Sequence, residues 1–293
     1  MSFLSHLISG VSLGSIYAII ALGYTMVYGI AKMLNFAHGD VIMVGAYACF
    51  FIVSRYGMSP LLGVLLSVAV CTLLGILIER LAYKPLRAAP SLAVLITAIG
   101  ISYLLQNSAQ LLWTSNPKVF TSVVGAGSLK FAGGRLSISV TAIVTIVICA
   151  VIMLALTWFT GKTKMGKAMR ACSEDKGAAQ LMGINVNFTI SMTFAIGSAL
   201  AAIAGVLLCS AYPTLMPTTG SMPGIKAFTA AVFGGIGSIP GALLGGTLLG
   251  IIEIFGKAYI STQLSDAIVF AVLIIVLLVK PTGLLGTRIQ EKV

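Results

Sequence analysis

Long apolar blocks alternate with short polar breaks along almost the whole chain. Each block approaches the ~20 residues that a helix needs to cross the hydrocarbon core of a bilayer. The blocks predict eight transmembrane helices, at about residues 3–30, 39–54, 60–79, 91–112, 138–160, 186–211, 240–257 and 263–279. We therefore expect an all-α polytopic membrane protein with a single domain over residues 1–293 and no appended soluble domain.

The composition supports lipid as the surrounding solvent. Hydrophobic residues make up 58% of the 293 residues and charged residues only 9%, which excludes a water-soluble globule with a charged surface. The net charge of +11 does not indicate nucleic-acid binding, because the lysines and arginines lie in the polar breaks rather than on one basic face. The five cysteines form no CxxC pair, so we expect packing residues and no metal site.

Positive charge concentrates in three of the breaks, at residues 80–87, 161–185 and 280–292. Basic breaks are retained on the cytoplasmic side, so we expect these three inside and the loop at 113–137 outside. Eight crossings do not satisfy this orientation, because the three helices after the second basic break would leave the C-terminus outside. An additional or broken crossing is therefore expected between residues 212 and 262.

Two interruptions of the apolar pattern are candidates for functional breaks. Residues 31–40 place Asn35, His38 and Asp40 between two apolar blocks, either as an ordinary loop or as a polar break that lines a translocation path. The second interruption is rich in glycine and contains a proline, at Gly234, Gly235, Gly237 and Pro240. It is either a helix-packing region or a broken helix whose freed backbone groups face protein or a cavity.

The longest charged break, at about 161–185, has the pattern of a short cytoplasmic helical element. Ser173 is a candidate N-cap, Glu174 and Asp175 follow in the first helical turn, and Gly183 stands where the helix would end. Apolar residues at helical spacing give the element one apolar side. An element of this kind is expected to dock onto another surface, although a solvated loop is the alternative.

The same segment contains an incomplete phosphate-binding motif. Gly161, Gly166 and Lys167 have the spacing of GxxxxGK[ST], but Ala168 stands where a magnesium-binding hydroxyl is needed, and an apolar span precedes the motif instead of a buried strand. His6 and His38 are the only histidines, and the chain has neither HExxH nor GxSxG. We therefore expect no enzymatic activity and no cofactor in this chain.

Three stretches resemble a known family: GSIYAIIALGYTMVYGIAKMLNFAHGDVIMVGAY at 14–47, LITAIGISYLLQN at 95–107 and GSIPGALLGGTLLGIIE at 237–253. They resemble the high-affinity branched-chain amino acid ABC importer permeases, specifically the shorter permease subunit. The resemblance implies a fold like that of type II importer permeases, with about eight helices of which one or two are broken or re-entrant. It also implies a location in the bacterial inner membrane.

The resemblance further implies partners and a coupling site. The partners would be a second, different permease, two ATPase subunits that bind ATP and magnesium, and a periplasmic substrate-binding protein. Residues 170–185 resemble the family's EAA loop, the coupling helix that enters a cleft of the ATPase, although Arg170 and Ala171 replace its usual acidic start. The implied coupling residues are Arg170, Ala171, Glu174, Asp175, Ala178 and Gly183.

A branched-chain substrate requires an apolar path with a few polar groups for its charged ends. The candidate path residues are Asn35, His38, Thr97, Gln106 and Asn107. The alternative is an ion-coupled secondary transporter or channel for small polar solutes, which requires ionisable groups inside the membrane. Its candidates are His38, Asp40, Glu253 with Lys257, and Asp266. The choice among branched-chain amino acids, urea, amides and other amino acids stays open at this point.

Overall fold

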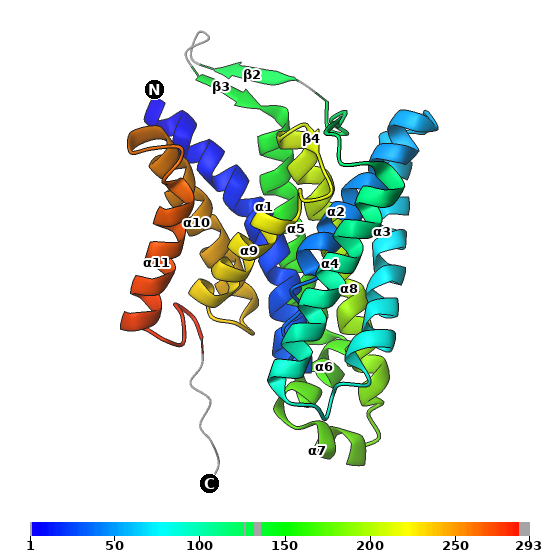
Figure 1. Ribbon diagram of the computed structural model, residues 1–293. Helices are drawn as coiled ribbons and strands as arrows, with labels where there is room; N and C mark the ends of the chain where they lie inside the picture. Colours follow the sequence, from blue (N-terminus) through cyan, green and yellow to red (C-terminus); the bar gives the residue numbers. More distant parts are fainter. Residues whose placement is uncertain (1, 126, 132–135, 287–293) are drawn as a thin grey trace.

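The computed structural model describes residues 2–125, 127–131 and 136–286, which form one helical bundle (Figure 1). Six helices of the described residues are long and apolar enough to cross a membrane. They are α1 (Ser2–Ala31), α3 (Pro60–Ile78), α4 (Ser91–Trp113), α5 (Val140–Lys162), α8 (Val186–Ala211) and α10 (Ile239–Tyr259).

Shorter elements complete the bundle and its two ends. The shorter helices are α2 (His38–Phe50), α6 (Lys164–Glu174), α7 (Lys176–Leu181), α9 (Ser221–Gly234) and α11 (Ser265–Val279). A π-helical turn extends α2 (η1, Phe51–Arg55), and another extends α3 (η2, Glu79–Tyr83). Two antiparallel strand pairs are β1 (Lys118–Val119) with β4 (Thr214–Leu215) and β2 (Ser128–Phe131) with β3 (Leu136–Ser139).

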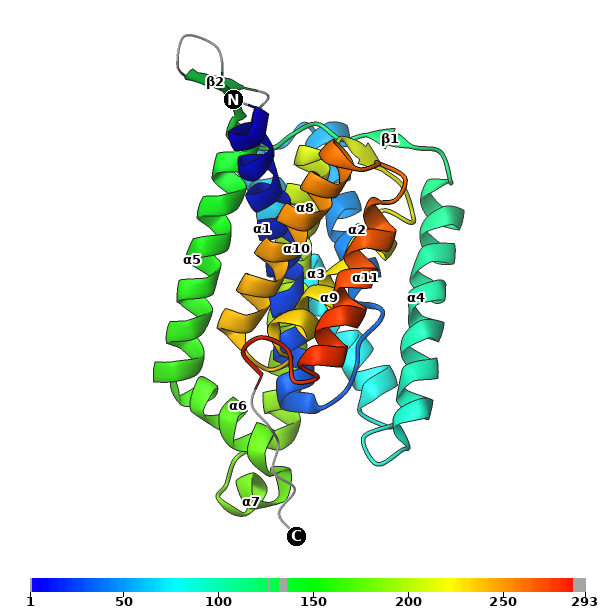
Figure 2. The same ribbon diagram turned by 90° about the vertical axis from the view of Figure 1, so that its left-hand side faces the viewer.

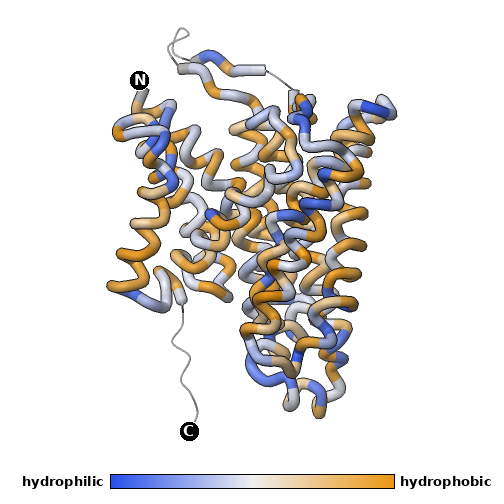
Figure 3. Tube along the Cα trace, viewed as in Figure 1, coloured by the Kyte–Doolittle hydropathy of each residue, from blue (hydrophilic) through white to orange (hydrophobic). Residues whose placement is uncertain are grey.

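The orientation expected from the charges agrees with the arrangement of the ends. The breaks at 80–87 and 161–185 and the end of α11 lie at one end of the bundle, with α6 and α7, whereas the β-strands and the N-terminus lie at the other (Figures 1 and 2). We name these the cytoplasmic and outer ends. Hydrophobic residues fill the zone between them (Figure 3). Within the third basic break, the residues from 287 onward lie outside the described residues.

The predicted count of eight spans is not confirmed, because α9 is an additional segment. It leaves the outer-end loop that contains β4 and ends beside the segment that follows α11 (Figure 1). There, the backbone N–H of Leu284 donates to Phe233 O and that of Leu285 donates to Gly234 O, both at 2.9 Å. With α9 running towards the cytoplasmic end, α10 and α11 return the chain to that end. α9, a helix of 14 residues, thus lies in the region where an additional or broken crossing was expected.

The core is formed by α1 and α8, whose apolar windows are 78% buried, whereas that of α4 is only 17% buried. The most extensive contact of α1 is with α10, and small residues allow it. A Cβ atom at Gly246 would lie 2.5 Å from Ala18 Cα, and one at Gly14 would lie 2.6 Å from Thr247 Cα. No larger residue fits without moving one of the two backbones.

The glycine-rich interruption is the turn between two helices. α9 ends at Gly234 and α10 begins at Ile239. Gly235 and Gly237 have φ of +103° and +98°, a region that favours glycine. Ser238 Oγ caps the next helix by accepting from Gly241 N at 3.2 Å, and Pro240 lies in its first turn, where its missing N–H is not needed. The interruption thus joins α9 to α10 and does not divide a single span.

The early interruption is a buried break rather than a solvated loop. After α1, Lys32 adopts φ of +59° and its backbone N–H donates to Tyr28 O at 2.9 Å, which closes the helix in a left-handed cap. The chain then runs without helix to α2 at His38. Asn35, His38 and Asp40 are each at most 3% exposed, so this polar segment lies inside the bundle.

Candidate functional site

Two short helices begin inside the bundle and meet at their first turns. Neither α2 nor α9 has a side-chain cap at its N-terminus. A Cβ atom at Gly39 would lie 2.7 Å from Gly220 O, and one at Gly224 would lie 2.9 Å from Gly39 Cα, so glycine permits this contact. Helix starts carry free N–H groups and partial positive charge, which makes such a meeting point suited to polar ligands.

Polar side chains from three helices converge at this meeting point. Gln106 Nε2, on α4, donates to Asp40 Oδ1 of α2 at 2.9 Å and lies 3.2 Å from Ser221 Oγ of α9. It also lies 3.3 Å from Ser102 Oγ, one turn earlier on α4. We name Asp40, Ser102, Gln106 and Ser221 the polar junction. Asp40 is 2% exposed, so its carboxylate depends on these partners.

The five predicted path residues fall in different places. Gln106 belongs to the polar junction. Asn35 Oδ1 accepts from Tyr83 OH at 3.0 Å, which places it between the early break and η2. His38 stacks edge-on against Tyr24, with ring centroids 4.7 Å apart. Their roles in transport stay predictions.

The other two path residues lie away from the junction. Thr97 precedes Gln106 by two and a half helical turns and therefore lies on the opposite face of α4. Asn107 is exposed, and its side chain donates to Tyr103 O at 2.7 Å. The structure therefore gathers Asp40, Ser102 and Ser221 around Gln106 instead. Ser102 could have been found from the sequence, because it lies four residues before Gln106 and therefore on the same face of the helix.

Three of the ionisable residues considered for ion coupling, Glu253, Lys257 and Asp266, belong to a closed network among α1, α9, α10 and α11. His38 and Asp40 lie outside it. Glu253 Oε1 accepts from Lys226 Nζ at 2.8 Å and from Lys257 Nζ at 2.6 Å. Its other oxygen accepts from Tyr17 OH at 2.8 Å. Lys226 also pairs with Asp266 at 2.6 Å. Two lysines thus balance two carboxylates, which disfavours a carrier of a coupling ion. The sequence reasoning missed Lys226.

The cytoplasmic element consists of α6 and α7, and its caps differ from the expectation. Thr163 Oγ1 caps α6 by accepting from Gly166 N at 3.0 Å. Asp175 Oδ1 caps α7 by accepting from the N–H groups of Gly177 and Ala178 at 2.7 and 3.0 Å. The prediction of Ser173 as N-cap is wrong: Ser173 lies in the last turn of α6 and donates to Arg170 O. Asp175 accepts from two N–H groups at once, so it is a better N-cap than Ser173, and α6 and α7 are separated at Asp175.

The element has an inner and an outer apolar face. Met169, Cys172 and Ala179 are buried against the bundle, near Met26 and Ile30 of α1. Burial raises the pKa of the Cys172 thiol, which keeps it protonated. On the other side, Leu181 is 90% exposed and Met182 is 82% exposed at the tip of α7. Exposed apolar residues at the tip of an otherwise polar element are typical of a docking surface.

The predicted coupling residues lie on or beside this docking surface. Glu174, Asp175 and Ala178 are exposed, whereas Ala171 is half-buried. Arg170 Nη2 donates to Gly161 O at 3.1 Å and braces the junction of α5 and α6. Gly183, with φ of +82°, follows α7 as expected for a glycine that ends a helix. Their contacts with a partner stay predictions.

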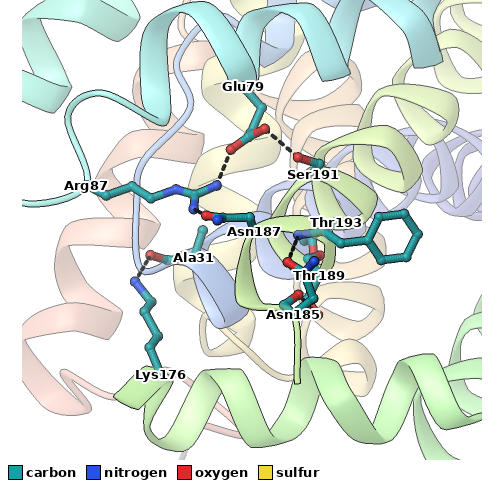
Figure 4. Close-up of polar contacts among 10 residues, drawn as sticks. Ala31, Glu79, Arg87, Lys176, Asn185, Asn187, Thr189, Ser191 and Thr193 are labelled. Carbon is teal, nitrogen blue, oxygen red and sulfur yellow. Dashed lines mark hydrogen bonds and ion pairs between the residues drawn. The ribbon is translucent and has the colours of Figure 1, made fainter. Parts of the chain in front are cut away.

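Polar contacts tie the element to the early break and tie the start of α8 to the end of α3 (Figure 4). Lys176 Nζ, at the start of α7, donates to Ala31 O at 2.9 Å, the last residue of α1. Burial lowers the pKa of Lys176, and the positive charges of Arg87 and Lys32 add to this effect. Arg87 pairs with the carboxylate of Glu79 and with the amide oxygen of Asn187, just after the element.

Comparisons with known proteins agree with this architecture. The model of the family described as "Branched-chain amino acid transport system / permease component" matches residues 6–277. The high-affinity branched-chain amino acid transport system permease protein LivH of Escherichia coli (strain K12) is 46% identical over 99% of this chain and 98% of its own. BraD of Pseudomonas aeruginosa, of the same description, is 45% identical over the same shares.

The similarity extends to an archaeal relative and to a solved structure. The probable branched-chain amino acid transport permease protein LivH of Methanocaldococcus jannaschii is 29% identical over 93% of this chain and 89% of its own. The solved structure PsaBC from Streptococcus pneumoniae in complex with Fab has a TM-score of 0.50 and 14% identity, and the match covers 95% of this chain and 92% of that chain. This structural likeness concerns the fold alone.

Proposed function

Because this chain belongs to the branched-chain amino acid transport system permease family, we propose that it is the permease subunit of an ABC importer that carries branched-chain amino acids across the bacterial inner membrane. The observation that carries the proposal is the direct connection between the cytoplasmic element and the polar junction. The connection joins the docking surface for the ATPase subunits to the polar junction, where the substrate would bind.

The connection runs along the backbone of the early break. Lys176 of the element holds Ala31, and the non-helical segment 32–37 leads from there to α2, whose first turn carries Asp40. Tyr83 OH steadies this segment from the side through Asn35 Oδ1. A displacement of the element therefore acts on the start of α2 through only a few residues. A rigid helix would transmit the same displacement to the opposite end of the bundle instead.

The polar junction has the groups that an amino-acid zwitterion requires. The carboxylate of Asp40 can accept from the ammonium group, and the starts of α2 and α9 favour the negative carboxylate. Ser221 and Gln106 can exchange their mutual contact for contacts with the passing substrate. The aliphatic side chain would pass along apolar walls of the bundle, since it needs no specific polar partner.

Partner subunits supply the remaining parts of this transporter. Two ATPase subunits would bind ATP and magnesium and dock on the tip of α7, where Leu181 and Met182 are exposed. A second, different permease would complete the path, and a periplasmic binding protein would deliver the substrate. The weakly buried α4 supports this arrangement, because Asn107, an exposed amide on this helix, would otherwise face lipid.

Uptake of radiolabelled leucine into vesicles tests the proposal. The chain is reconstituted with its co-purified partners, and uptake is measured with ATP inside the vesicles, without ATP, and with only an ion gradient. Uptake that requires internal ATP and is inhibited by isoleucine and valine is the expected result. Uptake driven by the ion gradient without ATP would contradict the proposal, and inhibition by urea or short amides alone would contradict the substrate.

A further inference from the structure

A cavity of about 380 Å3 lies at the cytoplasmic end between the end of α3 and the start of α8. It is separate from the polar junction. Its lining residues are Arg80, Lys84, Asn185, Asn187, Phe188 and Ser191. Arg80 lies in the π-helical extension of α3, and Lys84 follows it. The other four come from α8 and its N-cap, and Figure 4 shows Asn185, Asn187 and Ser191 among them.

The lining offers hydrogen-bond donors with few acceptors. Arg80 and Lys84 are exposed, and their side chains form no ion pair or hydrogen bond with the described part of the chain. Asn185 Oδ1 already accepts from Phe188 N at 3.0 Å, and Asn187 Oδ1 accepts from Arg87. Both amides therefore present their NH2 groups as free donors, next to two positive charges.

The nearest carboxylate does not neutralise these two charges. Glu79 is fully buried, and its oxygens are taken by Arg87 and by Ser191 Oγ, the latter at 2.6 Å. The cavity thus keeps a positive charge that is not balanced within the described residues. An anion with several oxygen atoms matches such a site.

The surroundings of the cavity are apolar and face the membrane. Leu77 is 52% exposed and Leu81 is 70% exposed on α3 and its extension, and Phe188 is 56% exposed on α8. These side chains continue the lipid-facing side of α3 directly up to the two basic residues. A basic pocket between transmembrane helices at the cytoplasmic boundary, with apolar residues beside it, matches a phospholipid with its headgroup in the pocket and its acyl chains along the helix.

We propose that this cavity binds the headgroup of an anionic phospholipid of the cytoplasmic leaflet. The phosphate lies between Arg80 and Lys84 and accepts from the amide groups of Asn185 and Asn187. Basic residues that only set the orientation of the chain in the membrane need not line one cavity, whereas Arg80 and Lys84 do. Because Asn185 and Asn187 directly follow the cytoplasmic element, the bound lipid also steadies the attachment of that element to α3.

Native mass spectrometry on the assembled transporter tests this site. The complex is reconstituted in nanodiscs of phosphatidylcholine with a minor fraction of phosphatidylglycerol, and the phosphatidylglycerol retained after extraction into mild detergent is counted. We expect R80Q/K84Q to retain about tenfold less of it than the wild-type chain. The charge-preserving R80K/K84R should retain it, and the single variants R80Q and K84Q should show intermediate loss.

A matched control removes the same charge elsewhere at the cytoplasmic end. K162Q/K164Q alters two exposed lysines at the end of α5 and the start of α6 and should leave retention unchanged. Equal loss in this control would show general attraction to the membrane surface and overturn the site, as would full retention in R80Q/K84Q. Displacement of the lipid by an equal concentration of glycerol 3-phosphate would also overturn the assignment to a lipid.

Discussion

At the scale of single residues, the proposed connection between the cytoplasmic element and the polar junction depends on one hydrogen bond, from Lys176 to Ala31 O. One ammonium group holds the carbonyl at the end of α1, where a helix carries partial negative charge. Burial lowers the pKa of Lys176, and the neighbouring charges of Arg87 and Lys32 lower it further, so the surroundings of Lys176 disfavour its charged form. That the chain places a lysine at a site that disfavours its charge argues for a specific role of the contact.

Replacement of Lys176 should therefore uncouple transport from ATP hydrolysis. In Lys176→Met, we expect leucine uptake per ATP hydrolysed to fall by about tenfold, since a charge-assisted hydrogen bond is lost. Lys176→Arg keeps a donor and should restore part of the ratio. Lys167→Met removes an exposed lysine of α6 and serves as the control. If uptake and hydrolysis fall in proportion, Lys176 affects only assembly or stability.

The polar junction makes a second prediction at this scale. Gln106→Leu removes the donor that joins Asp40 to Ser221, so we expect leucine uptake to fall by about tenfold or more. Asn107→Leu changes the next residue, which is exposed, and should change uptake little. A larger effect at Asn107 than at Gln106 would argue against the junction as the substrate path. Initial uptake rates at equal amounts of reconstituted protein give the comparison.

At the scale of elements, the two helix starts inside the bundle, those of α2 and α9, depend on the contact between Gly39 and Gly220. A Cβ atom at Gly39 meets backbone, which cannot rotate away as a side chain can. Gly100 on α4 is the contrasting case, because nothing lies within 4 Å of a Cβ atom there. The same substitution at these two glycines therefore separates packing from helix propensity.

Gly39→Ala should lower the free energy of unfolding by about 1–3 kcal/mol, as expected for an overpacked core. Gly100→Ala should leave it unchanged or raise it by up to ~1 kcal/mol, because alanine favours the helical backbone. Thermal unfolding of the two purified variants in the same detergent tests the difference. Equal melting temperatures for both variants would show that the helix starts do not touch as described.

The sequence was sufficient for most elements and for part of the site. Apolar blocks located eight helices, but α9 escaped, because Lys226 and the glycines at its end lower its hydropathy. Gln106 was found because amide side chains are unusual within a membrane span, although the same signal also selected Asn107, which faces outward. Ser221 was not, since a hydroxyl in a helix can bond its own backbone and so gives no signal. Its meeting with Gln106 joins residues 115 apart and depends on the fold.

At the scale of the whole molecule, the outer-end strands and the tip of α7 lie at opposite ends of the bundle (Figure 1). In a membrane, these two ends face opposite sides of the bilayer. All five native cysteines are buried, and burial leaves them poorly accessible to soluble reagents. Introduced cysteines can therefore report the orientation against a low background.

Val119→Cys and Leu181→Cys test this topology directly. Val119 is 80% exposed at the outer end and Leu181 is 90% exposed at the tip of α7. In intact cells, a membrane-impermeant maleimide should label only the first variant, and permeabilisation should expose the second. Labelling of Leu181→Cys in intact cells would place the tip of α7 outside the cytoplasm and refute the orientation.

The closed network around Glu253 has an electrical consequence. Two ammonium groups and two carboxylates cancel, and an amino-acid zwitterion likewise carries no net charge. Moving one elementary charge through the membrane field involves about 2.3 kcal/mol per 100 mV. Transport of a zwitterion past a neutral network moves no net charge through this field. Uptake at saturating ATP should therefore be the same whether vesicles are clamped at zero potential or polarised with a potassium gradient and valinomycin. The transporter would then work against the concentration of its substrate alone, independent of the voltage of the cell.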